Sequence, residues 1–243
     1  MSTLKKVLVG LLIFVGLGVI ASVILAFSFV QGMKGDPEEE EKVRQQAEQY
    51  VREHFEVGTT SIYDVLYDNM GNFNFEYAAK VHHETYGTNF LVYLDEDTGE
   101  MEDTFIEEKW RDDAEKAIQP YINEKLGESL TSEEMVPIAN GDDWDEIQKQ
   151  LKGKIELYVT FDEHAVSELN VDPNNLVSYN ELNVFPDSIR LTIWRDKQDE
   201  DERIFNEIIT TIRAEGIVQH GDFQVEYIQS GEQLAEGIWE KRF

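Results

Sequence analysis

The side chains best suited to hold a metal ion are His82, His83 and Glu84, which follow one another in the sequence. The residues before them alternate between apolar and polar, which predicts a β-strand. Successive side chains of a strand point to opposite faces, so His82 and Glu84 share a face that His83 does not. One histidine and one glutamate are too few ligands for a zinc site. We therefore expect no metal centre at this position.

Two groups of acidic residues offer the oxygen ligands that calcium prefers. The first runs from Asp95 to Asp103, and the second comprises Asp142, Asp143, Asp145 and Glu146. An EF-hand loop beginning at Asp95 needs glycine at its sixth position, where Glu100 stands. The EF-hand motif therefore fails, and only weak calcium binding outside that motif stays open. A third acidic run, 199–202, stands where a helix is predicted to begin, and the helix dipole favours acids there.

Sequence motifs of catalysis are absent. The chain has no G-x-S-x-G elbow, no H-E-x-x-H and no glycine-rich phosphate loop. A pair of carboxylates of the glycosidase kind stays possible, because the distance between such carboxylates is a property of the fold. We therefore expect a protein without catalytic residues or a cofactor. The alternative is an envelope-associated hydrolase that uses acidic residues.

An uncharged run of 24 residues, Val7 to Val30, precedes all of these groups. As a helix it would be roughly 36 Å long, enough to cross a hydrocarbon core of about 30 Å. The run is longer than the apolar part of a cleavable signal peptide, which spans about 7 to 15 residues. Lys5 and Lys6 precede it and Lys34 alone follows closely, and positive residues favour the cytoplasmic side. We therefore expect a single-pass cell-membrane protein with a cytoplasmic N-terminus and an extracytoplasmic C-terminal region.

A stripe of small residues, Gly18, Ser22 and Ala26, recurs every four positions within this run. Small residues let two transmembrane helices approach closely. A homodimer is therefore conceivable, and a second alternative function is that of a structural subunit that assembles through its transmembrane helix.

Acidic residues far outnumber basic residues in the chain. The chain has 50 acidic and 21 basic residues, and no acidic residue precedes Asp36. Three of the basic residues do precede it, so residues 36–243 carry a formal charge of −32. Such a surface repels polyanions, which argues against nucleic acid and anionic lipid as ligands. Cationic peptides, basic protein patches and divalent cations remain admissible partners. The chain has no cysteine, so disulfides and thiol chemistry are excluded.

The first module after the membrane is predicted to contain a helix, an antiparallel meander and a second helix. Asp36 can cap the first helix, Pro37 suits its first position, and Glu39 can bond back to the cap. Pro120 should kink or interrupt the second helix. The expected helices cover about 36–57 and 106–126, and the expected strands cover 63–67, 73–81, 90–94 and 100–105.

The turn from Asp95 to Met101, with Thr98, Gly99 and Glu100 in it, resembles the D-x-x-T-G-E turn of PepSY-type extracytoplasmic modules. The layout of one anchor and two modules is similar to that of YfjL-like membrane proteins of Gram-positive bacteria. These resemblances imply a binding or inhibitory module, and they transfer no functional residue.

The second module is predicted to be a ferredoxin-like α+β sheet. A strand at 189–193, a helix at about 199–215 and a strand at 223–227 suit a right-handed crossover between parallel strands. Asp143 can cap a short helix that Gly153 ends, and a further strand lies at 155–161. Residues 176–184 are predicted to form an edge strand, and the tail through Trp239 packs back or stays loose.

The sequence thus favours an α+β protein that binds a protein or peptide outside the cytoplasm. Its aromatic side chains either form a contact surface or pair within the sheets; they are Tyr63, Tyr67, Tyr86, Tyr93 and Tyr158. The expected segments are a cytoplasmic tip at 1–6, a transmembrane helix at 7–30, a linker at 31–36 and modules at 37–128 and 129–243.

Overall fold

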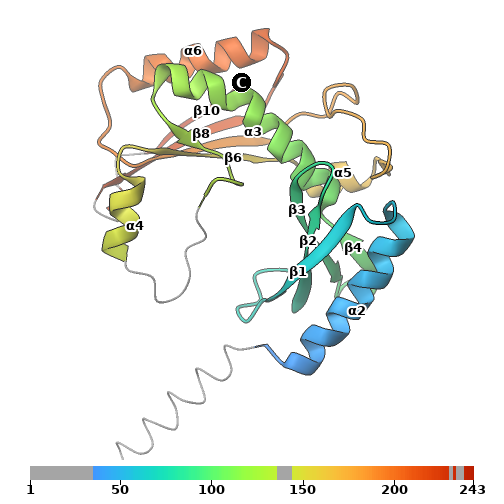
Figure 1. Ribbon diagram of the computed structural model, residues 1–243. Coiled ribbons are helices and arrows are strands. Elements are labelled where there is room, and N and C mark those ends of the chain that lie inside the picture. The colour runs from blue at the N-terminus through green and yellow to red at the C-terminus, as the bar shows by residue number, and fades with distance from the viewer. Residues whose placement is uncertain (1–34, 136–143, 230–231, 234–237) are drawn as a thin grey trace, which may run out of the picture. The chain divides into compact units, whose positions relative to one another are not determined.

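The computed structural model describes residues 35–135, 144–229, 232–233 and 238–243 (Figure 1). The apolar run Val7–Val30, its small-residue stripe, and Asp142 and Asp143 lie outside the described residues. No helix within the described ranges is both long and apolar enough to cross a membrane.

The fold is α+β and divides into two compact units. The first unit comprises the chain up to His82 together with Leu91–Asp103, and the second comprises His83–Phe90 together with Thr104–Phe243. We expected a boundary near residue 129. In the structure the helix that precedes this point belongs to the second unit, because its apolar face packs against the second sheet.

The first unit begins with helix α2, Pro37–His54, as predicted. The Asp36 carboxylate accepts a hydrogen bond from the Glu38 amide at 2.9 Å and so caps the helix. Glu39 pairs with Lys42 instead of bonding back to the cap. The buried face of the helix carries Ala47 and Val51.

The first sheet is the predicted antiparallel meander. It contains β1 (Thr60–Tyr67), β2 (Tyr77–His83), β3 (Thr88–Leu94) and β4 (Met101–Asp103), in the order β1-β2-β3-β4. Strand β2 begins at Tyr77 and not at Phe73. The Asp68 carboxylate accepts hydrogen bonds from the Met70, Asn72 and Phe73 amides, which folds the chain before β2 into a turn.

The second sheet is mixed. Its strands are β5 (Ser129–Leu130), β6 (Ile155–Thr160), β7 (Ser188–Ile193), β8 (Asp222–Gln229), β9 (Glu232–Gln233) and β10 (Trp239–Arg242). The order is β10-β8-β7-β6-β5, and β9 pairs with β8. The tail therefore packs back, because β10 pairs with β8 in antiparallel register.

Helix α6, Asp201–Ala214, connects β7 to β8, and these strands are parallel, as the crossover prediction requires. They are also direct neighbours in the sheet. A ferredoxin-like sheet is built from split βαβ units, in which another strand separates the two connected strands. The ferredoxin-like prediction is therefore wrong at this crossover.

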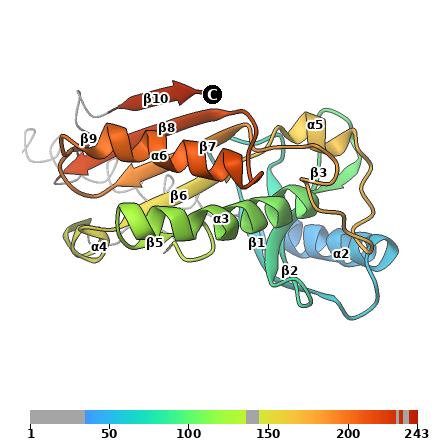
Figure 2. The ribbon, with the colours of Figure 1, turned by 90° about the horizontal axis from the view of Figure 1, so that it is seen from above.

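Helix α3, Phe105–Lys125, lies beside α6 on one face of the second sheet (Figures 1 and 2). It continues through Pro120, so the proline does not interrupt it. Both Lys116 and Pro120 are exposed. The Lys116 carbonyl, which loses its helical donor at Pro120, can therefore bond to water.

The core of the second unit lies between this helical layer and the sheet. Ile155, Leu157 and Val159 of β6 point into the core, and their neighbours along the strand are half-buried. The other half of the alternating pattern forms a polar sheet face, as expected for a sheet with one covered side. Two shorter helices complete the unit, α4 (Trp144–Leu151) and α5 (Glu163–Ser167).

The predicted edge strand at residues 176–184 does not form. The segment folds into turns, with the Val184 amide donating to the Tyr179 carbonyl at 3.0 Å. The Val177 carbonyl accepts the Trp110 indole N–H at 3.0 Å. A side chain and local turns thus satisfy backbone groups that a strand would have paired.

Candidate functional site

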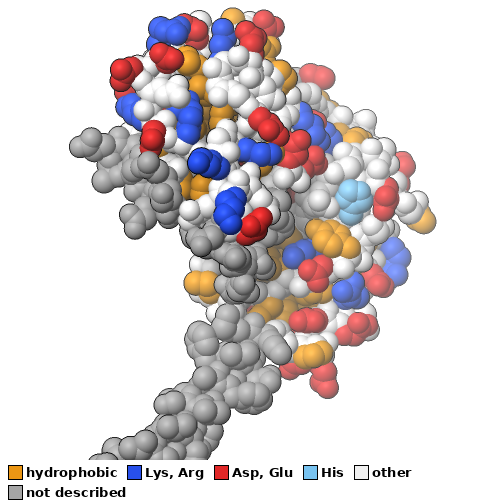
Figure 3. All heavy atoms as spheres, turned by 60° about the vertical axis from the view of Figure 1, so that its left-hand side comes forward, with side chains coloured by type: hydrophobic (Ala, Val, Ile, Leu, Met, Phe, Trp, Pro, Cys, Tyr) orange, Lys and Arg blue, Asp and Glu red, His pale blue; other side chains and the backbone are white. Residues whose placement is uncertain are grey.

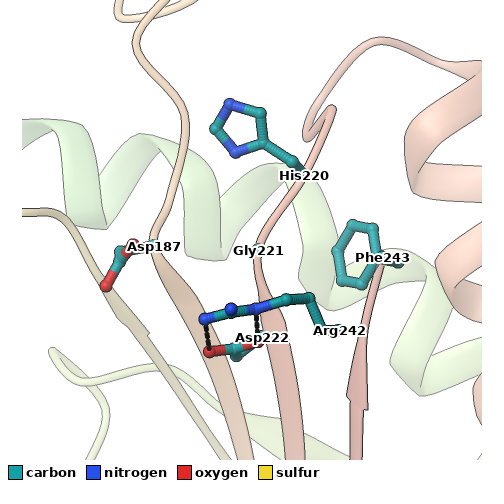
Figure 4. Close-up of a pocket in the computed structure, with 6 residues that line it drawn as sticks. All are labelled: Asp187, His220, Gly221, Asp222, Arg242 and Phe243. Carbon is teal, nitrogen blue, oxygen red and sulfur yellow. Dashed lines mark hydrogen bonds and ion pairs between the residues drawn. The ribbon is translucent and has the colours of Figure 1, made fainter.

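Charged side chains meet where strands β7, β8 and β10 border one end of the second sheet. Asp187 precedes β7, Asp222 opens β8 and Arg242 closes β10. Because β7 and β8 are parallel and β10 is antiparallel to β8, all three side chains reach the same end (Figure 4). They line an open hollow of about 290 Å³, and its other lining residues are His220, Gly221 and Phe243.

An ion pair fixes the guanidinium in this hollow. Arg242 donates from Nε to Oδ1 of Asp222 at 2.9 Å and from Nη2 to Oδ2 at 3.1 Å. The bonds from Arg242 lower the pKa of the Asp222 carboxyl. Since the Arg242 side chain is 85% exposed, the pair contributes little to folding stability. Its paired geometry does hold the guanidinium plane in a defined orientation.

The backbone around Gly221 forms one wall of the hollow. Gly221 and Phe243 exchange two hydrogen bonds, N–H to carbonyl, at 3.2 and 3.1 Å. A Cβ atom on Gly221 would lie 2.9 Å from the Pro186 carbonyl oxygen, and φ is +153°. Only glycine fits this close approach.

The hollow presents charged and aromatic side chains at the surface. Figure 4 shows the His220 ring and the Phe243 ring above the Arg242 guanidinium, with Asp222 below it. The His220 ring also makes an edge contact with Phe185, with 5.8 Å between ring centroids. None of the six lining residues is a serine, threonine or cysteine. The hollow thus offers ion pairing and hydrogen bonding, but no hydroxyl or thiol nucleophile.

Comparisons of the chain with protein-family models, with curated proteins and with solved structures find no match.

A buried polar network on α3 replaces a strand along part of the β6 edge. The Glu115 carboxylate accepts the Val159 amide at 3.0 Å, and Arg111 donates from Nε to the Val159 carbonyl at 3.0 Å. The other oxygen of Glu115 accepts the Ser132 amide at 2.7 Å and the Ser132 hydroxyl at 2.6 Å. Strand β5 pairs only with Ile155 and Glu156. These side chains therefore satisfy the β6 backbone beyond the end of β5.

Burial raises the pKa of Glu115, although the Ser132 and Val159 bonds counteract part of this rise. The neighbouring Asp112 accepts a hydrogen bond from the Thr88 hydroxyl at 2.8 Å. Burial, together with the negative charge of Glu133, raises the pKa of Asp112 to about 7. All of these groups join elements of the second unit, and no sequence motif marks them.

The acidic run at 199–202 contains one buried member, Asp201. It accepts two bonds from Arg195 at 2.8 Å and one from the Tyr227 hydroxyl at 2.7 Å. Burial opposes ionisation of Asp201, but the bonds from Arg195, the Gln198 amide and Tyr227 outweigh it and lower the pKa. The helix-dipole explanation holds for its place in the first turn of α6. The buried pairing was not predicted.

The histidines at the end of β2 are separated as the alternation predicts. His83 is buried, and its ring stacks on Phe105 with centroids 4.9 Å apart. His82 is half-buried and Glu84 is exposed. Within the described ranges, no three His, Asp or Glu side chains are grouped so that they could hold a metal ion.

The Asp95 carboxylate is turned into its own hairpin. It accepts bonds from the Thr98 and Asp97 amides at 2.6 and 2.9 Å and from the Asn74 side chain. The Thr98 bond is the largest cause of its lowered pKa. Asp95 thus builds the turn that resembles the PepSY-type sequence, and its oxygens already have hydrogen-bond donors.

Among the five tyrosines considered for a contact surface, four lie against another side chain. The pairs are Tyr67 with Tyr77, Tyr86 with His83, Tyr93 with Phe75 and Tyr158 with Arg111. The fifth, Tyr63 on β1, is 55% exposed. Tyr63 is therefore the member of this set that is best placed to meet a partner.

Proposed function

We propose that the chain is a membrane-anchored, extracytoplasmic protein that binds a cationic protein or peptide segment without catalysing a reaction. The anchor is Val7–Val30, and the orientation follows from Lys5 and Lys6 before it. Residues 36–243 then face the outside of the cell as the binding region.

The excess of negative charge in both units is the observation that supports a cationic partner. From Asp36 onward, the first unit has 17 acidic and four basic side chains, and the second has 33 and 14. Formal charges of −13 and −19 raise the local concentration of cations and speed their association. Figure 3 shows acidic and basic side chains intermixed on the face in view.

The basic residues of the first unit leave most of this charge uncompensated. Three of the four pair with acids, as Lys42–Glu39, Arg52–Glu48 and Lys80–Asp64. Even if each cancels one acid, most of the 17 acidic groups are left to attract a partner.

The topology can be tested with single cysteines, because the chain has none of its own. Thr3→Cys and the exposed position Glu215→Cys are compared in intact cells with a membrane-impermeant maleimide. We expect Glu215→Cys to be labelled directly and Thr3→Cys only after permeabilisation. The reverse pattern would rule out the proposed orientation.

Binding can be tested with the full chain in detergent micelles and fluorescent deca-lysine or deca-glutamate peptides. We expect deca-lysine to bind and its affinity to fall at least tenfold between 50 and 300 mM salt, because screening weakens exposed charge pairs. Deca-glutamate should not bind. Equal binding of both peptides, or of neither, would refute a cationic partner.

A further inference from the structure

Strand β1 differs from the other edge strands in length. Among the described strands, the sheets end at β1 and β4 in the first unit and at β5 and β10 in the second. The last three have three, two and four residues, whereas β1 has eight. Short edge strands are one way in which proteins prevent unwanted strand pairing. By this measure β1 is the edge best able to pair with a further strand.

The composition of β1 also lacks the usual protection of an edge. Its sequence, TSIYDVLY, contains no proline, glycine or lysine. Its one charged residue, Asp64, is paired with Lys80 of β2 at 3.0 Å. The second sheet shows the contrast, because Glu115 and Arg111 bond to the β6 backbone beyond β5. Buried side chains thus satisfy the backbone of β6 at one sheet edge, whereas β1 is a long edge strand with no proline, glycine or lysine in it.

We propose that an extended basic segment of a partner binds to β1 as an added strand. Alternate residues of an edge strand direct their N–H and C=O groups away from the sheet, and an added strand pairs with them. Tyr63 would contact the aliphatic stem or the charge of a lysine or arginine in this strand. This inference rests on the proposed function and gives it a location and a peptide conformation.

The negative charge of the first unit distinguishes between two strands that could pair with β1, a second copy of β1 and a basic segment of another protein. A second copy of β1 would bring together two first units, each with a formal charge of −13 from Asp36 onward, which disfavours pairing of two copies. A lysine- or arginine-rich segment is attracted by the same charge. The charge therefore favours a basic segment from another protein as the added strand.

The test uses the full chain in detergent micelles and a fluorescent ten-residue peptide of alternating lysine and valine. Its control is the same peptide with N-methyl groups on alternate backbone amides, which keeps the charge but removes hydrogen-bond donors from one edge. We expect the methylated peptide to bind at least tenfold more weakly. Equal affinities would overturn strand addition while leaving a cationic partner intact, and failure of the lysine peptides altogether would also overturn the proposed function.

Two substitutions locate the binding edge. Tyr63→Lys places a positive charge on β1, whereas Phe73→Lys makes the same change at an aromatic residue that is also 55% exposed but lies outside the strand. We expect at least a tenfold loss of peptide affinity for Tyr63→Lys and less than a threefold loss for Phe73→Lys. Circular dichroism checks that both variants are folded. Equal losses would refute binding at β1.

Hydrogen exchange gives a readout that does not depend on substitutions. Bound peptide should slow exchange of alternate amides within Thr60–Tyr67, and β4 should be unchanged. Protection elsewhere without protection of β1 would overturn the proposal. So would a dimer of the peptide-free chain that Tyr63→Lys dissociates, because a second copy would then occupy the edge.

Discussion

Glu115 of α3 bonds to the Val159 amide of β6 at 3.0 Å, although 44 residues separate them in the sequence. A helix side chain thus takes the place of a neighbouring strand. Glu115 is fully buried, so its removal leaves amides that water cannot easily reach.

We predict that Glu115→Ala lowers the free energy of unfolding by about 2–5 kcal/mol, because the Val159 and Ser132 amides lose their acceptor. The measurement is urea unfolding followed by circular dichroism. The matched control is Glu124→Ala on the same helix, where the side chain is 71% exposed, and it should change stability by less than about 0.5 kcal/mol. Similar losses of unfolding free energy for both variants would contradict the role of Glu115 as acceptor for the Val159 and Ser132 amides.

The pH dependence of stability should report on Asp112. Its pKa in the folded protein, about 7, is above that of an unfolded aspartate, so the folded state binds the proton more tightly. The contribution of Asp112 to stability is therefore present at low pH and is lost as pH rises towards 7. We predict that Asp112→Asn reduces the decline in stability between pH 5 and 8 by more than about 1 kcal/mol. The half-buried Asp113, changed to Asn, serves as control, and an unchanged pH profile in Asp112→Asn would refute the assignment.

Asp201→Ala should destabilise the second unit by about 3–5 kcal/mol, because it leaves Arg195 and the Tyr227 hydroxyl without their buried acceptor. Asp199→Ala removes an exposed acid two residues earlier and should cost less than about 0.5 kcal/mol. Thermal unfolding of both variants measures the difference. Equal melting temperatures of the two variants would show that the buried Asp201–Arg195 pair does not stabilise the fold more than an exposed acid does.

Pro120→Ala is expected to stabilise α3. An alanine amide can donate to the Lys116 carbonyl, and proline within a helix is unfavourable by about 3 kcal/mol, so we predict a gain of about 1–3 kcal/mol. Pro173→Ala is the comparison, because Pro173 follows Asp172 in a turn closed by the Asn175 amide at 3.1 Å. There the loss of proline should destabilise by up to about 1 kcal/mol. Changes of the same sign would contradict this reasoning.

Local patterns predicted much of the fold. The Asp36–Pro37 start of α2 and the alternation at Ile189, Leu191 and Ile193 each specify an element from adjacent residues. Strand β10 was not predicted, because its four residues are defined by pairing with β8 and not by their own periodicity. The failed edge strand at 176–184 had a poor alternating pattern, and its backbone bonds to Trp110 instead.

The candidate site was harder to predict because no motif joins its members. Asp187, Asp222 and Arg242 meet only through strand register. The expected parallel crossover was the available signal, since it brings the starts of two strands to one border of the sheet. The buried pairing of Asp201 was not predicted for a similar reason, because its partner Tyr227 lies 26 residues further along the chain.

The seal on β6 also constrains the order of folding. The bonds from Glu115 and Arg111 form only when α3 has docked on a strand more than 40 residues away. Until then the backbone of β6 near Val159 is open to pairing with other chains. We therefore expect the refolding yield to fall at high protein concentration, because chains aggregate through β6. The helix–strand contact that stabilises the folded protein thus also determines how long the folding chain can aggregate.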